Sequence, residues 1–151
     1  GVQVMGSTTY EWLLDQEDVL GHPEKWQAFF GAMRTVVFSS RTLPVPRGAD
    51  VLIVDGPVAS HISAIRERAA QGVVWVVGGG VLASQFLAAG LLDRVEVTVA
   101  PVILGSGAAM FASPIAFPTL RLREAQVGGP FVHAIYDVEG EPRVVAPHLD
   151  V

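Results

Sequence analysis

The stretch at residues 73–86 (VVWVVGGGVLASQF) constrains the fold more than any other part of the chain. Five apolar, mostly β-branched residues lead directly into Gly78, Gly79 and Gly80, and apolar residues then recur at helical spacing. A run that is apolar on both faces predicts a strand covered on both sides of a sheet. Glycines let the backbone turn sharply, and the start of the following helix offers unpaired N–H groups that suit a phosphate. The stretch therefore predicts a nucleotide-phosphate site at a strand-to-helix turn.

Composition limits what the rest of the chain can be. With 151 residues, 50% of them apolar and 17% charged, the sequence predicts a single packed domain over residues 1–151. The net charge of −5 argues against a nucleic-acid partner. The absence of cysteine excludes disulfides and thiolate metal ligands, and the four histidines lack ligand spacing, so we expect no metal. No apolar run has membrane-spanning length and no signal peptide is visible, which favours a soluble cytoplasmic protein without a membrane partner.

The pattern of apolar residues predicts alternating strands and helices in the first two thirds of the chain. Thr8 and Glu11 fit a capping box that opens a helix after a first strand at residues 2–5. A stripe of Val58, Ile62, Ile65 and Ala69 predicts another helix. Further strands are expected at residues 35–38, 51–54, 94–100, 120–127 and 131–138, and Val144-Val145 suggests a last edge in a polar tail at 139–151.

This order of elements defines the fold class. Helices between the early strands imply parallel pairing through crossovers, whereas the two strands around the glycine-rich turn at 128–130 imply an antiparallel hairpin. We therefore expect an α/β fold with a mixed, mostly parallel sheet, helices on both of its faces and a C-terminal antiparallel hairpin.

A dinucleotide-binding Rossmann domain is one interpretation of the glycines. Gly78-x-Gly80-x-x-Ala83 matches its fingerprint, and Glu96 follows Gly78 by 18 residues, near the position of a ribose-binding acid. However, that acid should end the second strand, whereas Glu96 lies inside an alternating one. The βαβ units that should follow are also replaced by strands alone, so the context disfavours this interpretation.

Four ordered motifs carry a different interpretation. They are residues 5–11 (MGSTTYE), 38–41 (FSSR), 76–80 (VVGGG) and 97–107 (VTVAPVILGSG), the last followed by Met110-Phe111. In order and spacing they resemble the dihydrofolate-reductase superfamily, specifically the branch typified by the C-terminal reductase domain of bacterial riboflavin biosynthesis. The resemblance covers about residues 2–138, and it implies a dihydrofolate-reductase-like fold.

The resemblance implies an NADPH site along the carboxyl edge of the sheet. By analogy Gly78, Gly79 and Gly80 hold the pyrophosphate, with Val77, Val81 and Leu82 beside it. Ser39, Ser40 and Arg41 then contact the 2′-phosphate, for which hydroxyl donors and a guanidinium are suited. Gly6, Ser7 and Thr8 close on the cofactor from the other side, and Thr98 lines the substrate pocket near the nicotinamide.

The chain departs from the family pattern in two places. The family usually has arginine directly after the equivalent of Gly6, where this chain has Ser7, so a preference for NADPH rests more on Arg41. The family also begins with a strand and a mobile loop upstream of Met5-Gly6, and we expect the biological chain to include such a segment. No residue of this chain is assigned as catalytic.

The implied activity is hydride transfer from NADPH to a C=N or C=O carbon of a pterin-like or ribosylaminopyrimidine-like molecule. A homodimer is expected, since family members commonly pair through their sheets. Two alternatives remain open at this point. One is a nucleotide-binding protein of the same fold without turnover, and the other is a relative that binds flavin or deazaflavin.

Overall fold

The structure is a computed structural model that describes residues 1–112, 114 and 120–140. Within it the chain forms two compact units, Gly1–Leu82 and Ala83–Val151, which are described in turn. The predicted edge at Val144-Val145 and most of the predicted tail lie outside the described residues. The prediction of a single domain stays a prediction.

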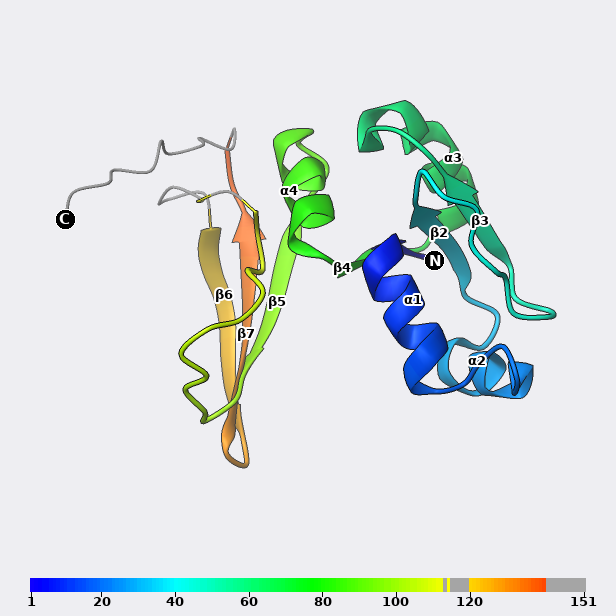
Figure 1. The fold of residues 1–151 in the computed structure, drawn as a ribbon. Helices are drawn as coiled ribbons and strands as arrows, with labels where there is room; N and C mark the ends of the chain where they lie inside the picture. The colour runs from blue at the N-terminus through cyan, green and yellow to red at the C-terminus, as the bar shows by residue number, and fades with distance from the viewer. Residues whose placement is uncertain (113, 115–119, 141–151) are drawn as a thin grey trace. The chain divides into compact units, whose positions relative to one another are not determined.

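The first unit is built on a four-stranded parallel sheet with the order β3-β2-β1-β4 (Figure 1). Its strands are β1 (Val2–Gly6), β2 (Arg34–Phe38), β3 (Val51–Val54) and β4 (Val74–Gly78). The helices between them are α1 (Ser7–Gln16), α2 (Pro23–Phe30), the 3-10 helix η1 (Val58–His61) and α3 (Ile62–Ala69). The sequence patterns predicted the four strands, α1, and a single helix where η1 and α3 lie, to within a few residues.

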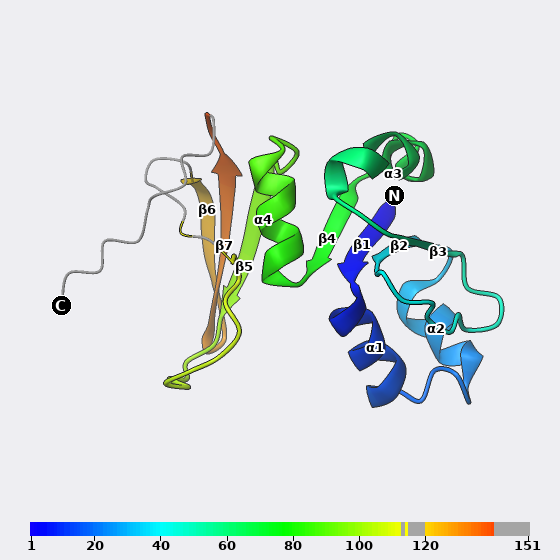
Figure 2. The same ribbon diagram turned by 45° about the horizontal axis from the view of Figure 1, so that its top comes forward.

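The sheet of the first unit has helices on both faces. On one face Met5 and Val37 pack with Tyr10, Leu14 and Trp26 of α1 and α2, which lie side by side in both views (Figure 2). The other face is covered by α3, which contacts β1, β2 and β4 and buries Ile65 and Ala69. The helices enclose the central residues of both strands, so β1 is buried over residues 2–5 and β2 over residues 35–37, as in other parallel sheets.

One polar pair lies inside this apolar sheet. Gln3 and Thr35 are both fully buried, and they face each other in the parallel register of β1 and β2. The amide of Gln3 donates a hydrogen bond of 2.8 Å from Nε2 to Oγ1 of Thr35. The bond satisfies one polar group of each residue, whereas Oε1 of Gln3 is buried without a hydrogen-bond partner in the described part of the chain.

The second unit is built on a three-stranded antiparallel sheet with the order β5-β7-β6. Its strands are β5 (Arg94–Val99), β6 (Leu120–Gly128) and β7 (Phe131–Val138), and β6 and β7 form the predicted hairpin. The helix α4 (Gly80–Ala88) leads into this unit, where Phe86 and Leu87 are buried. The sheet itself buries little, and of its side chains Val95 and Ala134 are among the few enclosed.

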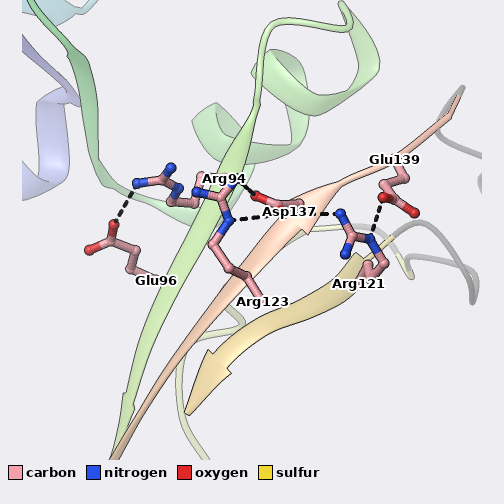
Figure 3. Close-up of polar contacts among 6 residues, drawn as sticks. All are labelled: Arg94, Glu96, Arg121, Arg123, Asp137 and Glu139. Atoms are coloured by element: carbon pink, nitrogen blue, oxygen red, sulfur yellow. Dashed lines mark hydrogen bonds and ion pairs between the residues drawn. The ribbon is translucent and has the colours of Figure 1, made fainter. Parts of the chain in front are cut away.

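Charged side chains cross the antiparallel sheet at one end (Figure 3). Asp137 of β7 accepts hydrogen bonds from Arg121 at 3.4 Å and Arg123 at 2.9 Å, both on β6. Arg121 also pairs with Glu139. On β5, Arg94 and Glu96 form a looser pair at 3.7 Å. Most of these groups are exposed, whereas the Asp137 side chain is only 15% exposed and forms the centre of the network.

The predicted fold class is confirmed, with one refinement and one correction. The parallel and antiparallel strands hydrogen-bond in two separate sheets, and β5 belongs to the antiparallel one. The expectation that strand 73–77 is covered on both faces is wrong at Trp75, which is 50% exposed, because β4 lies at the sheet edge while α1 and α2 cover β1 and β2. None of the helices in the described part of the chain is long and apolar enough to cross a membrane.

Candidate functional site

The carboxyl ends of three parallel strands meet at one edge of the sheet in the first unit. In the register of β1, Gly6 lies opposite Phe38 of β2, and Met5 lies opposite Gly78 of β4. Because the strands are parallel, the segments that follow them also start at this edge. The structure therefore brings together three predicted segments, which begin at Ser7, Ser39 and Gly79.

The glycine turn after β4 leaves room beside its backbone. Gly78 has a φ of +150°, a conformation that side-chain-bearing residues rarely adopt, and the bond between Gly78 and Gly79 is cis. A Cβ placed on Gly78 would lie 3.5 Å from Oγ1 of Thr9, so this turn adjoins the first turn of α1. A Cβ placed on Gly79 would meet no protein atom within 4 Å, so the space beside this residue is open.

The helix α4 begins directly at this turn, at Gly80. Its first residues differ in burial, since Val81 is exposed and Leu82 is buried. Val77, the last apolar residue before the turn, packs against the core formed by α1 and α2. A partly buried valine before the turn and a buried leucine after it thus anchor the turn, while Gly79 stays exposed.

The first turn of α1 lies at the same edge. Gly6 is its N-cap, in an extended conformation with φ −80° and ψ 163°, and no described side chain caps the helix. The predicted capping box of Thr8 and Glu11 is therefore wrong: the helix starts at Ser7, so Thr8 lies within the first turn and Glu11 is engaged elsewhere. A helix start without a side-chain cap leaves N–H groups for water or an anion.

The turn after β2 is stabilised by its own side chain and by β3. The backbone N–H of Ser39 donates to the carbonyl of Val54 at 2.9 Å. The hydroxyl oxygen of Ser39 accepts a hydrogen bond of 2.9 Å from the backbone N–H of Arg41. The Ser39 hydroxyl also donates a hydrogen bond of 2.9 Å to the backbone carbonyl of Arg41. The Ser39 hydroxyl is thus engaged within the turn, and Ser40 and Arg41 are exposed beyond it.

Arg41 is held by a carboxylate that the sequence reasoning did not assign to the site. Its Nη1 and Nη2 donate to Oε1 and Oε2 of Glu11 at 2.9 and 2.7 Å. This hydrogen bonding and the charge of Glu11 raise the pKa of the Arg41 guanidinium above its usual value. The two residues are 30 positions apart, and no local pattern in the sequence signals their contact.

The groups at this edge fit the two phosphate regions of a dinucleotide. The open space at Gly79 and the helix start at Gly80 suit a pyrophosphate, which binds main-chain N–H groups. Ser40 and the guanidinium of Arg41 suit a phosphate monoester. The donor set is therefore compatible with a nucleotide that carries both groups.

Thr98 is in the second unit, on β5. It lies opposite His133 of β7, and Oγ1 of Thr98 is 3.1 Å from Nδ1 of that histidine. This contact orients the hydroxyl within its own sheet. Its predicted place beside a substrate stays a prediction.

Comparison with known proteins identifies the family. The family model described as the RibD C-terminal domain matches residues 19–134, which is most of the chain. The chain belongs to the RibD C-terminal domain family. The resemblance stated from the four sequence motifs is thereby confirmed, and the chain is a reductase-like domain of the riboflavin-biosynthesis branch.

Solved structures related to the RibD C-terminal domain share the fold. A Shewanella sp. PV-4 protein assigned to riboflavin biosynthesis is 22% identical, with a TM-score of 0.67 over 91% of this chain and 73% of that one. A pyrimidine reductase-like protein from Corynebacterium diphtheriae is 17% identical, with a TM-score of 0.61 over 92% of this chain and 76% of that one. No match was found among curated protein sequences.

A third related structure belongs to a longer protein. It is the diaminohydroxyphosphoribosylaminopyrimidine deaminase/5-amino-6-(5-phosphoribosylamino)uracil reductase of Thermotoga maritima, which is 18% identical with a TM-score of 0.62. The match covers 91% of this chain but 45% of the Thermotoga chain. At these identities the likeness establishes the dihydrofolate-reductase-like fold of the RibD C-terminal domain.

Proposed function

We propose that the protein is an NADPH-dependent reductase that transfers hydride to a C=N or C=O carbon of a pterin-like or ribosylaminopyrimidine-like small molecule. One observation carries the proposal: the glycine turn, the start of α1 and the turn with Arg41 meet at one sheet edge. Membership of the RibD C-terminal domain family supports the same activity.

Each segment has a separate task in this proposal. Gly78, Gly79 and Gly80 hold the pyrophosphate, with Val77, Val81 and Leu82 beside it. The 2′-phosphate is bound by Ser40 and Arg41, in a turn that the Ser39 hydroxyl stabilises, while Gly6, Ser7 and Thr8 contact the cofactor from α1. Thr98 lines the substrate pocket. NADPH supplies the hydride, and the protein orients it and excludes water. A cytoplasmic homodimer is part of the proposal.

Titration of the full-length protein with NADPH and with NADH tests the site. Arg41→Ala removes the cation assigned to the 2′-phosphate. We therefore expect the affinity for NADPH to fall by about tenfold and the affinity for NADH to change by less than about twofold. Binding is measured by nicotinamide fluorescence, and the melting temperature of the variant checks that it is folded. Equal loss of both nucleotides, or of neither, would contradict the assignment of Arg41.

Turnover tests the rest of the proposal. Oxidation of NADPH at 340 nm with pterin or ribosylaminopyrimidine compounds is the expected result. Tight NADPH binding without oxidation by any such compound would favour the nucleotide-binding alternative, and a yellow protein as purified would favour the flavin or deazaflavin alternative.

A further inference from the structure

Glu11 binds the guanidinium of Arg41, the group that the proposed function assigns to the 2′-phosphate. Both of its carboxylate oxygens accept hydrogen bonds from the guanidinium, at 2.9 Å from Nη1 and 2.7 Å from Nη2. Arginine binds carboxylates and phosphates with this same bidentate geometry. Glu11 and a phosphate therefore compete for the same pair of donors.

The competition acts on one kind of nucleotide only. A 2′-phosphate has to displace the carboxylate from Nη1 and Nη2 of Arg41, and its charge is repelled by the carboxylate while the two are close. A 2′-hydroxyl needs no cation, and an acidic side chain can accept its hydrogen bond, as in proteins that bind NAD. Glu11 thus opposes NADPH without opposing NADH.

We propose that Glu11 is a specificity-determining residue: a resident counter-ion of Arg41 that lowers the preference for a 2′-phosphate over a 2′-hydroxyl. The proposal rests on the proposed function, because it takes the nucleotide to bind at this sheet edge. It goes beyond that function by assigning the degree of selectivity to a residue of α1 rather than to the phosphate-binding turn itself.

The exposure of the pair sets the size of the effect. The side chains of Arg41 and Glu11 are 60% and 39% exposed, so solvent screens their attraction and the pair separates at small cost. The carboxylate therefore lowers the affinity for NADPH without closing the site. Selectivity then changes by a factor of a few, rather than switching from one nucleotide to the other.

The experiment compares Glu11→Gln with a matched variant, Asp15→Asn. Both remove one negative charge from α1 and keep the side-chain size, but the side chain of Asp15 is exposed and Glu11 alone of the two pairs with Arg41. Dissociation constants for NADPH and NADH are measured by calorimetry on the full-length protein, and melting temperatures confirm folding. Adenosine 2′,5′-bisphosphate and AMP serve as shorter probes that lack the nicotinamide.

We expect Glu11→Gln to raise the affinity for NADPH and for adenosine 2′,5′-bisphosphate by roughly fivefold. NADH and AMP should stay the same or weaken, and Asp15→Asn should change every constant by less than about twofold. In an Arg41→Ala background the gain from Glu11→Gln should shrink, because there is no guanidinium left to release.

Several results would overturn the inference. A weaker binding of NADPH by Glu11→Gln would show that Glu11 orients Arg41 for the phosphate, and an equal change for all four nucleotides would show a general charge effect. If Arg41→Ala abolishes or weakens NADPH binding while Glu11→Gln leaves the ratio of the NADPH and NADH dissociation constants unchanged, this inference fails and the proposed function stands. If Arg41→Ala leaves NADPH unaffected, or neither dinucleotide binds, the proposed site fails and the inference with it.

Discussion

The two units of the chain differ in how they bury apolar residues. In Gly1–Leu82 the largest core side chains, Trp26, Tyr10 and Met5, are almost completely enclosed between the helices and the parallel sheet. In Ala83–Val151, by contrast, Val127 is 81% and Ile103 97% exposed, and the antiparallel sheet is joined mainly by its backbone ladder and exposed ion pairs. The comparison teaches that the turns of the candidate site are fixed by a packed core, whereas the second unit has little core of its own within the described residues.

Removing the largest core side chain is the strongest test of this contrast. Trp26 packs against the rings of Tyr10 and Phe30, with centroids 5.9 and 4.7 Å away. Trp26→Ala should lower the free energy of unfolding by about 3–5 kcal/mol, because it leaves a cavity. Urea unfolding measures the loss, and Trp26→Phe, with a smaller loss, covers the case in which the alanine variant does not fold.

Exposed positions provide the matched controls. Trp12→Ala in α1 and Val127→Ala in β6 both change exposed side chains, so each should cost less than about 0.5 kcal/mol. If Val127→Ala were as damaging as Trp26→Ala, the second unit would have a packed core and the contrast would fail.

The next effect concerns a titratable group in the core of the first unit. Burial raises the pKa of Tyr10 from 10.0 to about 12. The folded protein then keeps the phenol proton to a higher pH than the unfolded chain does. The stabilising contribution is complete below pH 10 and is lost as the pH rises through about 12, by about 3 kcal/mol in total.

Tyr10→Phe isolates this effect. The variant loses the hydrogen bond from the Tyr10 hydroxyl to the carbonyl of Pro44, which costs about 1 kcal/mol at neutral pH. Its unfolding free energy should then fall less between pH 10 and 12 than that of the unchanged protein. Parallel curves for the two proteins over this range would show that Tyr10 is not the group responsible.

A smaller change distinguishes the two phosphate regions of the proposed site. Gly79→Ala adds a methyl group where no protein atom lies within 4 Å. If a pyrophosphate occupies that space, the variant should lower the affinity for NADPH and for NADH alike, by about tenfold. Gly107→Ala in the second unit is the control, since its Cβ also meets no protein atom. Unchanged binding of both nucleotides by Gly79→Ala would place the pyrophosphate elsewhere.

The smallest effect is expected in the ion pairs of the antiparallel sheet. Asp137 is mostly buried and bonds two arginines, so Asp137→Asn should cost about 1 kcal/mol, and less at high salt. Glu96→Gln breaks only the 3.7 Å contact with Arg94 and should leave the melting temperature unchanged. Equal effects of the two variants would show that burial of Asp137 adds nothing to its pairs.

The sequence predicted those features of the fold that depend on neighbouring residues. The stripe that contains Ile65 and Ala69 predicted α3, and the alternation of Val95 and Val97 with polar residues predicted β5. For part of the site, the resemblance of the four motifs implied that Gly6 and Gly78 lie at one edge of the sheet, and the structure has both residues at that edge.

Features that depend on distant residues were not predictable in this way. Glu11 fitted a capping box on local spacing alone, but its partner is Arg41, which reaches it only because β1 and β2 are adjacent. The exposure of Trp75 depends on which strands the helices cover. The run of valines around Trp75 contains no information about that coverage. The motifs predicted a nucleotide site, whereas the contact between Glu11 and Arg41 became visible only in the folded structure.

The buried pair of Gln3 and Thr35 has a consequence for how the strands find their alignment. The other residues of β1 and β2 in the core, such as Val4 and Val36, are similar in shape and would pack acceptably after a shift. A slip of two residues would place Gln3 opposite Val37 and leave its amide enclosed without the threonine hydroxyl, at a cost of about 1–3 kcal/mol. One hydrogen bond thereby favours the alignment in which Gly6 lies opposite Phe38, and so helps to set the helix that carries Glu11 within reach of the turn that carries Arg41.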